Sequence, residues 1–369
     1  MKNSFIKAQL VSLTKISVLI FTSNPRSENL DFTLFIDDTA KKIRPNKISG
    51  AGNVSIFEFE LNEPYDFSKS YSISATGFTS QIVDASDAIY FKEFDELFNY
   101  DGDDLGARYH KEYTDFALWA PLASYVAVVF IDEPDNVLVM KRSDKGVYRL
   151  RVNGDNLNRK YYYILNNSGN ITYSSDPYSF GTSENSTYSA VVDLEAIKAM
   201  GKVALQDKIG NYVDQIIYET NIRDFTEQKG DATDIVNKGK YLGFIEEGKK
   251  TKAGHPAGLD YLKRLSISVV QLNPVIDFGT GDDFDLDKKY NWGYDPINMF
   301  SLEGSYSLHP EIPMERLIEF KKVVNKLHEC NIRLVMDVVY NHTYEYMTSC
   351  YQKIVPDYYF RRRKDGNLS

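Results

Sequence analysis

The sequence predicts a multidomain protein in which two N-terminal β-sandwich-like domains precede an incomplete (β/α)8 TIM barrel with about three strands. Short alternating apolar segments fill the first half of the chain. Strand and helix patterns alternate in the last third, and polar residues follow the ends of those later strands. We expect an N-terminal β-domain at residues 1–97, a second sandwich at 98–194, a linker at 195–206 and the barrel portion at 207–369.

The first domain is predicted from short strands separated by turns. Residues 16–21 form a strand pattern rather than part of a signal peptide, because Lys15 interrupts the apolar segment and no small-residue cleavage site follows. Residues 32–36, 54–59 and 71–75 are further short, mostly alternating runs. The pattern is that of a small β-sandwich, and we find no catalytic motif in it.

The second domain is also rich in strand patterns. Residues 116–121 form a strand that proline closes, and residues 126–131 form an unbroken apolar run. Residues 147–152 alternate, and residues 161–165 follow at a distance that fits a hairpin. These segments predict an antiparallel sandwich.

The pattern changes after about residue 207. Residues 215–219, 266–272 and 332–339 are predicted strands, the first of them buried, while residues 258–265 and 313–330 are predicted helices. Strands that alternate with helices imply a parallel sheet with right-handed crossovers. Functional sites in such sheets lie beyond the C-terminal ends of the strands.

The helix at residues 313–330 is predicted to be amphipathic. Its apolar side chains recur at helical spacing and should share one buried face: Leu317, Phe320, Val324 and Leu327.

Composition limits the possible ligands. The net charge of −9 argues against a nucleic-acid or anionic-membrane surface, which would need a basic footprint. No apolar run approaches the length of a membrane span. Cys330 and Cys350 form no metal-binding pattern. We therefore expect a cytoplasmic protein with no nucleic-acid partner and no membrane partner.

An acidic run invites a calcium interpretation. It comprises Asp282, Asp283, Asp285 and Asp287. A calcium-binding EF-hand loop that began at Asp283 would need glycine at its sixth position and glutamate at its twelfth, where Lys288 and Tyr294 stand. We therefore expect a solvated loop, no metal site and no cofactor, although calcium stays possible.

The most informative segment is residues 290–296, Tyr-Asn-Trp-Gly-Tyr-Asp-Pro. Gly293 separates Trp292 from Tyr294, which suits a turn that presents the two rings on different sides. Exposed rings in such loops can stack on the apolar faces of ligands. The alternative is a loop whose aromatic side chains pack under the rim of the barrel.

A second informative segment is residues 337–342, Asp-Val-Val-Tyr-Asn-His. Asp337 ends an apolar strand, and a buried carboxylate needs a cationic or hydrogen-bonding partner. Asn341 and His342 follow in a loop. The alternative to a functional site is a capped strand end with a packed histidine.

These two segments resemble motifs of the type I pullulanases, which are α-1,6-glucan debranching enzymes of the α-amylase superfamily. The first is similar to the signature that separates pullulanases from branching enzymes and amylases, and the second to the first conserved region of the superfamily. Residues 100–106 with 116–121 resemble the opening of a CBM48-type glycan-binding sandwich. Further similar segments are residues 217–225, 270–274 and 303–307.

The resemblance implies a set of substrate-binding residues. Tyr294 would stack on the glucose where cleavage occurs, and His342 would hydrogen-bond a hydroxyl group of that sugar. Trp292 and Asn291 would shape the loop that recognises the branch, and Asp295 belongs to the same substrate-binding set. The implied partner is an α-glucan such as pullulan, starch or glycogen.

Two further residues would support the site. The resemblance implies that Asp337 holds an arginine beside the nucleophile and that Asn341 supports the loop. No residue of this sequence matches the nucleophilic aspartate, the acid glutamate or the third aspartate of the family, or the arginine that would pair with Asp337. We therefore expect no catalytic residue in this chain.

The implied activity is retaining hydrolysis of α-1,6 linkages, a reaction that needs two carboxyl groups about 5–5.5 Å apart. The sequence resembles the N-terminal portion of such an enzyme, so we expect a truncated chain that is inactive alone. Two alternatives stay open: a non-catalytic α-glucan-binding fragment, and another debranching or branching enzyme of the same superfamily.

Overall fold

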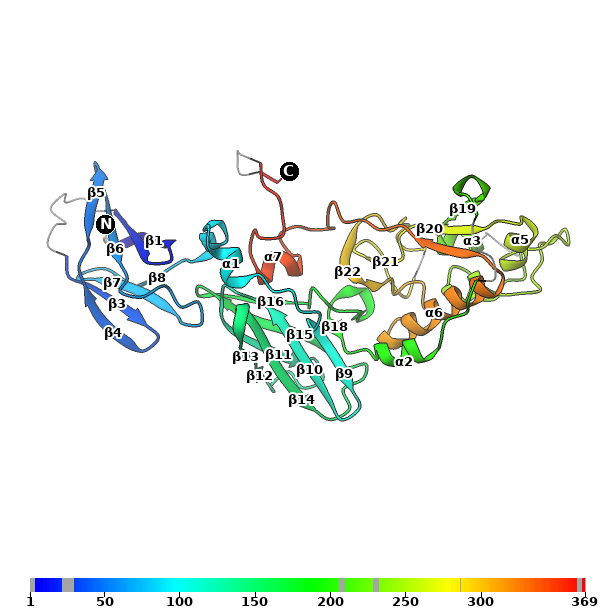
Figure 1. Cartoon of the computed structure of the whole chain (residues 1–369), viewed down its shortest axis with the longest axis horizontal. Coiled ribbons are helices and arrows are strands. Elements are labelled where there is room, and N and C mark those ends of the chain that lie inside the picture. Colours follow the sequence, from blue (N-terminus) through cyan, green and yellow to red (C-terminus); the bar gives the residue numbers. More distant parts are fainter. Residues whose placement is uncertain are drawn as a thin grey trace.

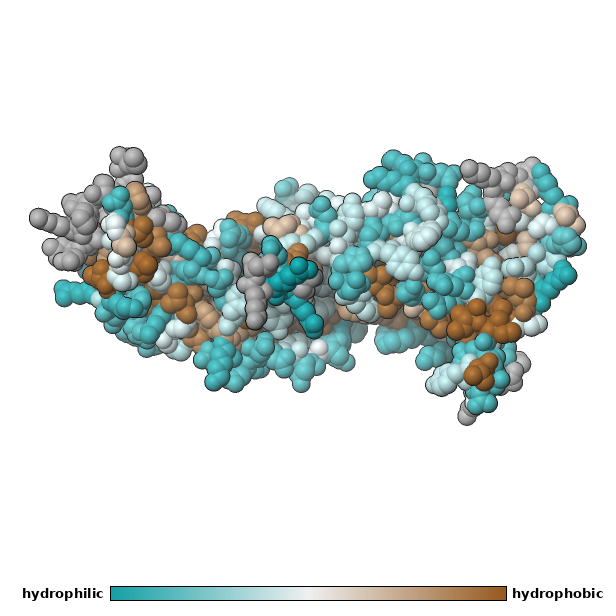
Figure 2. Space-filling view, turned by 90° about the horizontal axis from the view of Figure 1, so that it is seen from above, coloured by the Kyte–Doolittle hydropathy of each residue, from teal (hydrophilic) through white to brown (hydrophobic). Residues whose placement is uncertain are grey.

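A computed structural model describes residues 4–21, 30–205, 210–227, 232–285, 287–363 and 367–368 of the chain. Figure 1 shows an elongated arrangement in which two sheet-rich parts are followed by a part that mixes strands and helices. The face seen in Figure 2 is mostly hydrophilic, with apolar side chains in separate patches. Within the described ranges, no helix is both long and apolar enough to cross a membrane.

Two four-stranded sheets form the N-terminal part. The first has the order β1 (Ser4–Ser12), β2 (Lys15–Phe21), β6 (Val54–Glu60), β5 (Lys47–Ala51). The second has the order β4 (Thr39–Ile43), β3 (Phe32–Ile36), β7 (Tyr71–Ala75), β8 (Gln81–Ile82). All neighbouring strands are antiparallel, and the strands predicted in this part are confirmed.

The alternating sequence explains why these strands pack into a sandwich. In β2, Ile16, Val18 and Ile20 are fully buried while the residues between them are not. The Phe32 ring of the second sheet lies 4.9 and 4.8 Å, centroid to centroid, from the rings of Phe57 and Phe59 in the first. One face of each sheet therefore lies in a shared core.

The next part also contains two antiparallel sheets. The first has the order β13 (Lys141–Arg142), β14 (Val147–Asn153), β10 (Tyr113–Trp119), β9 (Gly106–His110). The second has the order β12 (Leu138–Val139), β11 (Ala123–Phe130), β15 (Lys160–Asn167), β18 (Ser189–Ala190), β17 (Gly181–Thr182), and β16 (Asn170–Ser174) also pairs with β15.

The predicted hairpin between residues 147–152 and 161–165 is wrong. The strands β14 and β15 are both present, but they lie in different sheets. Because β10 and β13 occupy the two edges of β14, β15 has no free edge there and pairs with β11 instead. The connecting residues cross from one sheet to the other.

Short helices lie within and between these parts. They are η2 (Ser86–Tyr90), α1 (Phe94–Phe98), η3 (Asp144–Gly146), η4 (Glu184–Ser186), α2 (Leu194–Ala199), η5 (Tyr212–Asp214) and α7 (Cys350–Ile354). The helix α7 packs on β16, and the Asn167 amide donates to the carbonyl of Ile354 at 3.2 Å. A late segment of the chain thus lies against the second sandwich, as Figure 1 shows.

The last part is built on a three-stranded parallel sheet of order β19 (Ile217–Thr220), β20 (Val269–Leu272), β23 (Arg333–Met336). Its helices are α3 (Ile222–Thr226), α4 (Tyr241–Phe244), α5 (Leu259–Arg264) and α6 (Pro313–Glu329). An antiparallel pair, β21 (Ile276–Phe278) and β22 (Pro296–Leu302), follows β20. The alternation of strand and helix predicted for this part is confirmed.

Two predictions of burial are wrong. The strand predicted at residues 215–219 is not buried, since Ile216 and Ile217 are more than half exposed. It is an edge strand of the described sheet, which leaves one side of it uncovered. On α6, Leu317 and Val324 are only half-buried, because the buried face is shared by apolar residues and by Arg316 and Glu319, which contact other segments.

Candidate functional site

The candidate site is built on the long loop between β21 and β22, residues 279–295. Its neck is closed by hydrogen bonds to Asp295, whose backbone carbonyl accepts from Gly279 N at 2.9 Å and whose Oδ2 accepts from Thr280 N at 3.0 Å. The Asn291 amide donates to Asp295 Oδ1 at 2.6 Å and to the Thr280 carbonyl at 2.8 Å. The polar atoms of Asn291 and Asp295 therefore hold the loop closed.

Gly293 sets the turn between the two neck residues, Asn291 and Asp295. Its φ of +90° is favourable only for glycine, and a Cβ atom there would lie 2.6 Å from the Pro274 carbonyl oxygen. Its backbone N–H donates to Asn291 Oδ1 at 2.9 Å. The predicted turn between Trp292 and Tyr294 is confirmed.

We expect Gly293→Ala to lower the free energy of unfolding by about 2 kcal/mol, because alanine would be strained at this φ and would meet backbone atoms. Urea titration measures the effect. Gly254→Ala is a matched control, since Gly254 also has a positive φ of 82° but nothing lies within 4 Å of its Cβ position. If the Gly293 variant loses no more stability than this control, the close approach to Pro274 does not contribute to the free energy of unfolding.

The aromatic rings of the loop face solvent. Tyr290, Trp292 and Tyr294 are 53%, 57% and 37% exposed, so they do not pack under a rim. The Trp292 ring N–H donates to the Tyr290 hydroxyl, which itself donates to Asp224 just after the start of α3. These hydrogen bonds hold the rings in place, and the faces of the rings stay open to a ligand.

The segment after β23 lies beside these rings. Asp337 directly follows the strand, and its Oδ2 accepts from the Tyr294 hydroxyl at 2.8 Å. His342 Nε2 lies 2.7 Å from the Tyr294 carbonyl oxygen. Burial, followed by the hydrogen bond to Asp337, raises the pKa of Tyr294 to about 12. Three residues predicted from two separate motifs therefore meet in one place.

The remaining predicted site residue is Asn341, and two residues that were not predicted also contact the loop. Asn341 is exposed next to His342 rather than packed beneath the loop. The Tyr344 backbone N–H donates to the Pro296 carbonyl at 2.8 Å, and a Cβ atom on Gly279 would collide with the Tyr344 ring. Sequence reasoning missed Tyr344 and Asp224, although Tyr344 follows His342 by only two positions.

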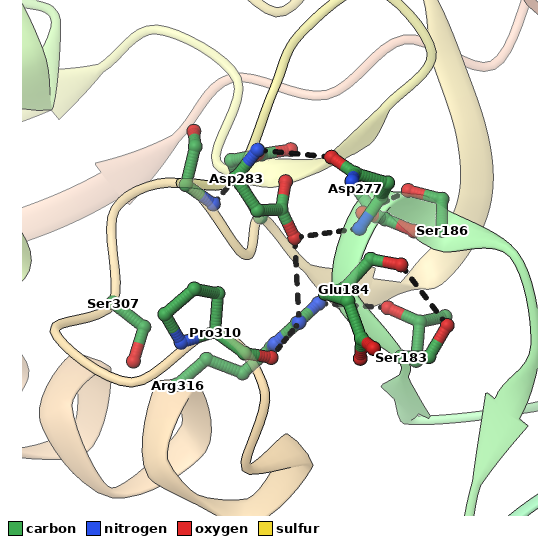
Figure 3. Close-up of polar contacts among 12 residues, drawn as sticks. Ser183, Glu184, Ser186, Asp277, Asp283, Ser307, Pro310 and Arg316 are labelled. Atoms are coloured by element: carbon green, nitrogen blue, oxygen red, sulfur yellow. Dashed lines mark hydrogen bonds and ion pairs between the residues drawn. The ribbon is translucent and has the colours of Figure 1, made fainter. Parts of the chain in front are cut away.

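A cluster of buried ionisable groups lies beside the loop, and Figure 3 shows Asp277, Asp283 and Arg316 of this cluster. It contains three carboxyl groups, Asp277, Asp283 and Glu303, and one guanidinium, Arg316, all no more than 5% exposed. The predicted solvated loop is therefore wrong for Asp283. Sequence alone could not show this, because its partners lie in the sandwich and on α6.

Arg316 joins three parts of the structure at this cluster. Its Nη1 donates to Thr182 Oγ1 at 2.7 Å and to the Leu302 carbonyl at 3.1 Å, and its Nη2 donates to the Pro310 carbonyl at 3.1 Å. Nη2 also lies 3.7 Å from Asp283 Oδ2. The charge of Arg316 is thus compensated by oxygen atoms from the sandwich, the loop and the segment before α6.

The carboxylates of this cluster resist ionisation. Burial raises the pKa of Asp277 to about 6, against the effects of Arg316 and the Asn298 amide. Burial, followed by the charges of Asp283 and Asp277, raises the pKa of Glu303 to about 8. A carboxyl group whose pKa is higher in the folded state than in the unfolded state stabilises the fold at low pH. That stability is lost as the pH rises through the folded-state pKa.

We therefore expect Asp277→Asn to raise the free energy of unfolding by about 1–2 kcal/mol at pH 8 and to leave it nearly unchanged at pH 4. The amide can still accept from Asn298 and donate to the Ser186 hydroxyl, which now contact Asp277 at 2.6 and 2.8 Å. Urea titrations at the two pH values measure the effect. Asp132→Asn is an opposite control, since hydrogen bonding to Arg159 lowers the pKa of Asp132 and that variant should lose stability at pH 8. A variant at position 277 that is less stable than the parent at pH 8 would contradict the assignment.

Other acidic residues of the loop pair with cations. Asp282 lies 2.6 Å from Lys288 and Asp287 lies 2.6 Å from Arg223. Within the part of the chain that the structure describes, no group of three or more histidine, cysteine, aspartate or glutamate side chains is arranged to hold a metal ion. Cys330 and Cys350 are free thiols.

Two protein families match parts of the chain. Residues 104–179 match carbohydrate-binding module 48, the isoamylase N-terminal domain, and residues 244–368 match the alpha amylase catalytic domain. The first match lies in the second sandwich, and the other begins at the end of α4 and covers β20, β23, the loop at residues 279–295 and the segment after β23.

Pullulanases are similar to the chain over most of its length. The pullulanase of Bacillus subtilis strain 168 is 34% identical over 83% of this chain and 42% of its own length. The structure of the Anoxybacillus sp. LM18-11 pullulanase complexed with maltotriose has a TM-score of 0.88 at 33% identity, and the match covers 99% of this chain and 52% of that one. The type I pullulanase structure from Bacillus subtilis, complexed with maltose, has a TM-score of 0.85 at 30% identity, with 100% and 51% covered.

The chain thus spans about half the length of the relatives that it matches. The similarity extends over both sandwiches and the parallel sheet. The fold, the two family matches and the position of the two motifs agree with one another. The chain is a pullulanase homologue in which a carbohydrate-binding module 48 precedes part of an alpha-amylase catalytic region.

Proposed function

We propose that this chain supplies the α-glucan-binding face of a pullulanase-type glycoside hydrolase, which cleaves α-1,6 branch linkages in pullulan, starch or glycogen with retention of configuration. The observation that carries the proposal is the meeting of Tyr294, Asp337 and His342 at the C-terminal end of β23. Sites of parallel α/β sheets lie at that end.

The chemistry of the face suits a neutral sugar. Glucose rings present apolar C–H faces that stack on aromatic rings, and Tyr290, Trp292 and Tyr294 offer such surfaces. Hydroxyl groups need donors and acceptors in fixed positions. The hydrogen bond between Tyr294 and Asp337 fixes the tyrosine ring, so that its orientation does not have to be set when the sugar binds.

His342 has a defined role in this proposal. Its Nε2 lies 2.7 Å from the Tyr294 carbonyl, which can only accept, so Nε2 carries a proton. In the neutral imidazole the other nitrogen, Nδ1, is then an acceptor for a sugar hydroxyl. Asn291 and Asp295 contribute by closing the neck of the loop, and Trp292 by its exposed ring.

Relatives support pullulanase rather than another debranching enzyme. Isoamylase 3 of rice is 32% identical over only 37% of this chain, whereas the Bacillus subtilis pullulanase match covers 83%. The Anoxybacillus pullulanase was solved with maltotriose and with maltotetraose. Short α-glucans are therefore the appropriate probes for this chain.

We further propose that these 369 residues bind α-glucan without hydrolysing it. Retaining hydrolysis needs two carboxyl groups about 5–5.5 Å apart on either side of the glycosidic bond. At the face of Tyr294, Asp337 accepts from the tyrosine and both oxygens of Asp295 accept within the loop. These hydrogen bonds position the tyrosine and close the loop, and we propose no catalytic role for either carboxylate.

Two assays test the proposal. Calorimetric titration with maltotriose should show saturable binding, and incubation with pullulan should release no reducing ends. Reducing ends released by the purified chain would refute the absence of turnover. A chain that binds neither maltotriose nor pullulan, although its far-UV spectrum shows that it is folded, would refute the binding function.

A further inference from the structure

We propose that Asn185, in the second sandwich, is a positioning residue for the aromatic loop and thereby raises the affinity of the chain for α-glucan. This inference rests on the binding function proposed above. Asn185 lies in η4, between β17 and β18 of the second sandwich, and the loop at residues 279–295 carries the exposed rings. The two segments are about a hundred residues apart in sequence.

A reciprocal pair of hydrogen bonds joins them. The backbone N–H of Asn185 donates to Asp283 Oδ2 at 3.0 Å, and the backbone N–H of Asp283 donates to Asn185 Oδ1 at 3.0 Å. Next to this pair, the Ser186 hydroxyl donates to Asp277 Oδ1 at 2.8 Å, in the strand β21 that leads into the loop (Figure 3). Two points of attachment fix both the place and the orientation of the loop segment.

Two ion pairs of the loop each have one partner that is more exposed than Asp283. Asp287 pairs with Arg223 but is 81% exposed on its side chain, and Asp282 pairs with Lys288, whose side chain is 62% exposed. Ion pairs of this kind contribute little to stability. The side chain of Asp283 is only 6% exposed and is also held by the buried Arg316. The sandwich therefore holds the loop at its most buried attachment.

The surroundings leave Asp283 little freedom to shift. A Cβ atom on Gly304 would lie 2.1 Å from Asp283 Oδ2 and 2.7 Å from Arg316 Nη2, so both side chains pack directly on the glycine backbone. Asn185 itself has a φ of +52°, a conformation that asparagine and glycine tolerate well. The turn at Asn185 therefore holds the Asp283 side chain in one position.

The test uses Asn185→Gly, which keeps the left-handed backbone but removes the acceptor for Asp283 N–H, and the double variant with Ser186→Ala. The chain has two tryptophans, the exposed Trp292 and Trp119, which is 6% exposed in the sandwich. With 5-fluorotryptophan in the full chain, 19F NMR therefore gives one signal for the loop and one for the sandwich. Trp292→Phe assigns the two signals.

We expect Asn185→Gly to shift or broaden the Trp292 signal, to leave the Trp119 signal unchanged and to weaken maltotriose binding about fivefold. The double variant should weaken it about tenfold, since it lacks both side-chain links. Asp37→Gly is the matched control. Asp37 has a φ of +50° and accepts from Ser70 N–H at 2.9 Å in the N-terminal sheets. Its replacement should therefore change neither the Trp292 signal nor the affinity for maltotriose.

The possible outcomes separate this inference from the proposed function. If the parent binds maltotriose and the variants bind it equally well with an unchanged Trp292 signal, Asn185 has no positioning role. If the variants change the Trp292 signal but the parent binds no maltotriose, the sandwich positions the loop and the binding function is wrong. A variant that changes both tryptophan signals alike has lost general stability, which also contradicts the inference.

Discussion

Replacement of Arg316 by methionine is expected to lower the free energy of unfolding by about 3–5 kcal/mol, because it removes the buried cation and leaves Asp283 without its charge partner. Methionine is shorter but has a similar volume, so the loss reports mainly on charge and hydrogen bonding. Urea titration at pH 7 measures it. The loss should shrink at lower pH, because burial raises the pKa of Asp283 and a protonated carboxyl group needs no cation.

Arg151→Met is the matched control for this prediction. Arg151 also pairs with an aspartate, through Nε and Nη2 at 2.7 Å from the two oxygens of Asp115, but its side chain is 56% exposed. We expect a much smaller loss there, because solvent screens an exposed ion pair. Addition of Asp283→Asn to the Arg316 variant should restore part of the lost stability. If the two arginine variants lose equal stability, the buried cluster does not hold the loop, the sandwich and α6 together.

Replacement of Tyr294 by alanine is expected to weaken maltotriose binding about thirtyfold, since a ring face that buries roughly 80 Å² of apolar surface is worth about 2 kcal/mol. The side chain is partly exposed, so the stability of the chain should change little. Calorimetric titration of parent and variant measures the ratio of dissociation constants.

Two further variants distinguish the ring from its hydroxyl group. Tyr294→Phe keeps the ring but loses the hydrogen bond to Asp337, and it should weaken binding by only about threefold. Tyr212→Ala removes a tyrosine of η5 that is 91% exposed and should have no effect. Unchanged binding by Tyr294→Ala would show that the ring does not contact the sugar.

Much of the fold could be predicted from the sequence because its signals are local. The alternation in β2 buries Ile16, Val18 and Ile20, and the spacing in residues 313–330 gives a helix. The pairing of strands cannot be predicted from local sequence, because it depends on which other strands occupy each edge. The edges of β14 were already occupied by β10 and β13, so the expected hairpin with β15 could not form.

The candidate site likewise has a part that the sequence predicted and a part that it did not. The two motifs predicted that Tyr294, Asp337 and His342 belong together, and the structure brings them into contact. The burial of Asp283 was unpredictable from an acidic run, because Asn185 and Arg316 come from distant segments. The roles of Asn291 and Asp295 in closing the loop depend on which atoms their polar groups meet, and a sequence motif does not contain that information.

The most direct test of the account is a titration of the fluorotryptophan-labelled chain with maltotriose and, separately, with cellotriose, its β-linked counterpart. The account predicts that maltotriose shifts the Trp292 signal to saturation, that cellotriose does not, and that Trp292 responds in parallel with the heat of binding. A Trp292 signal that ignores maltotriose, or that responds equally to both trisaccharides, would contradict the claim that the aromatic loop is an α-glucan-binding face.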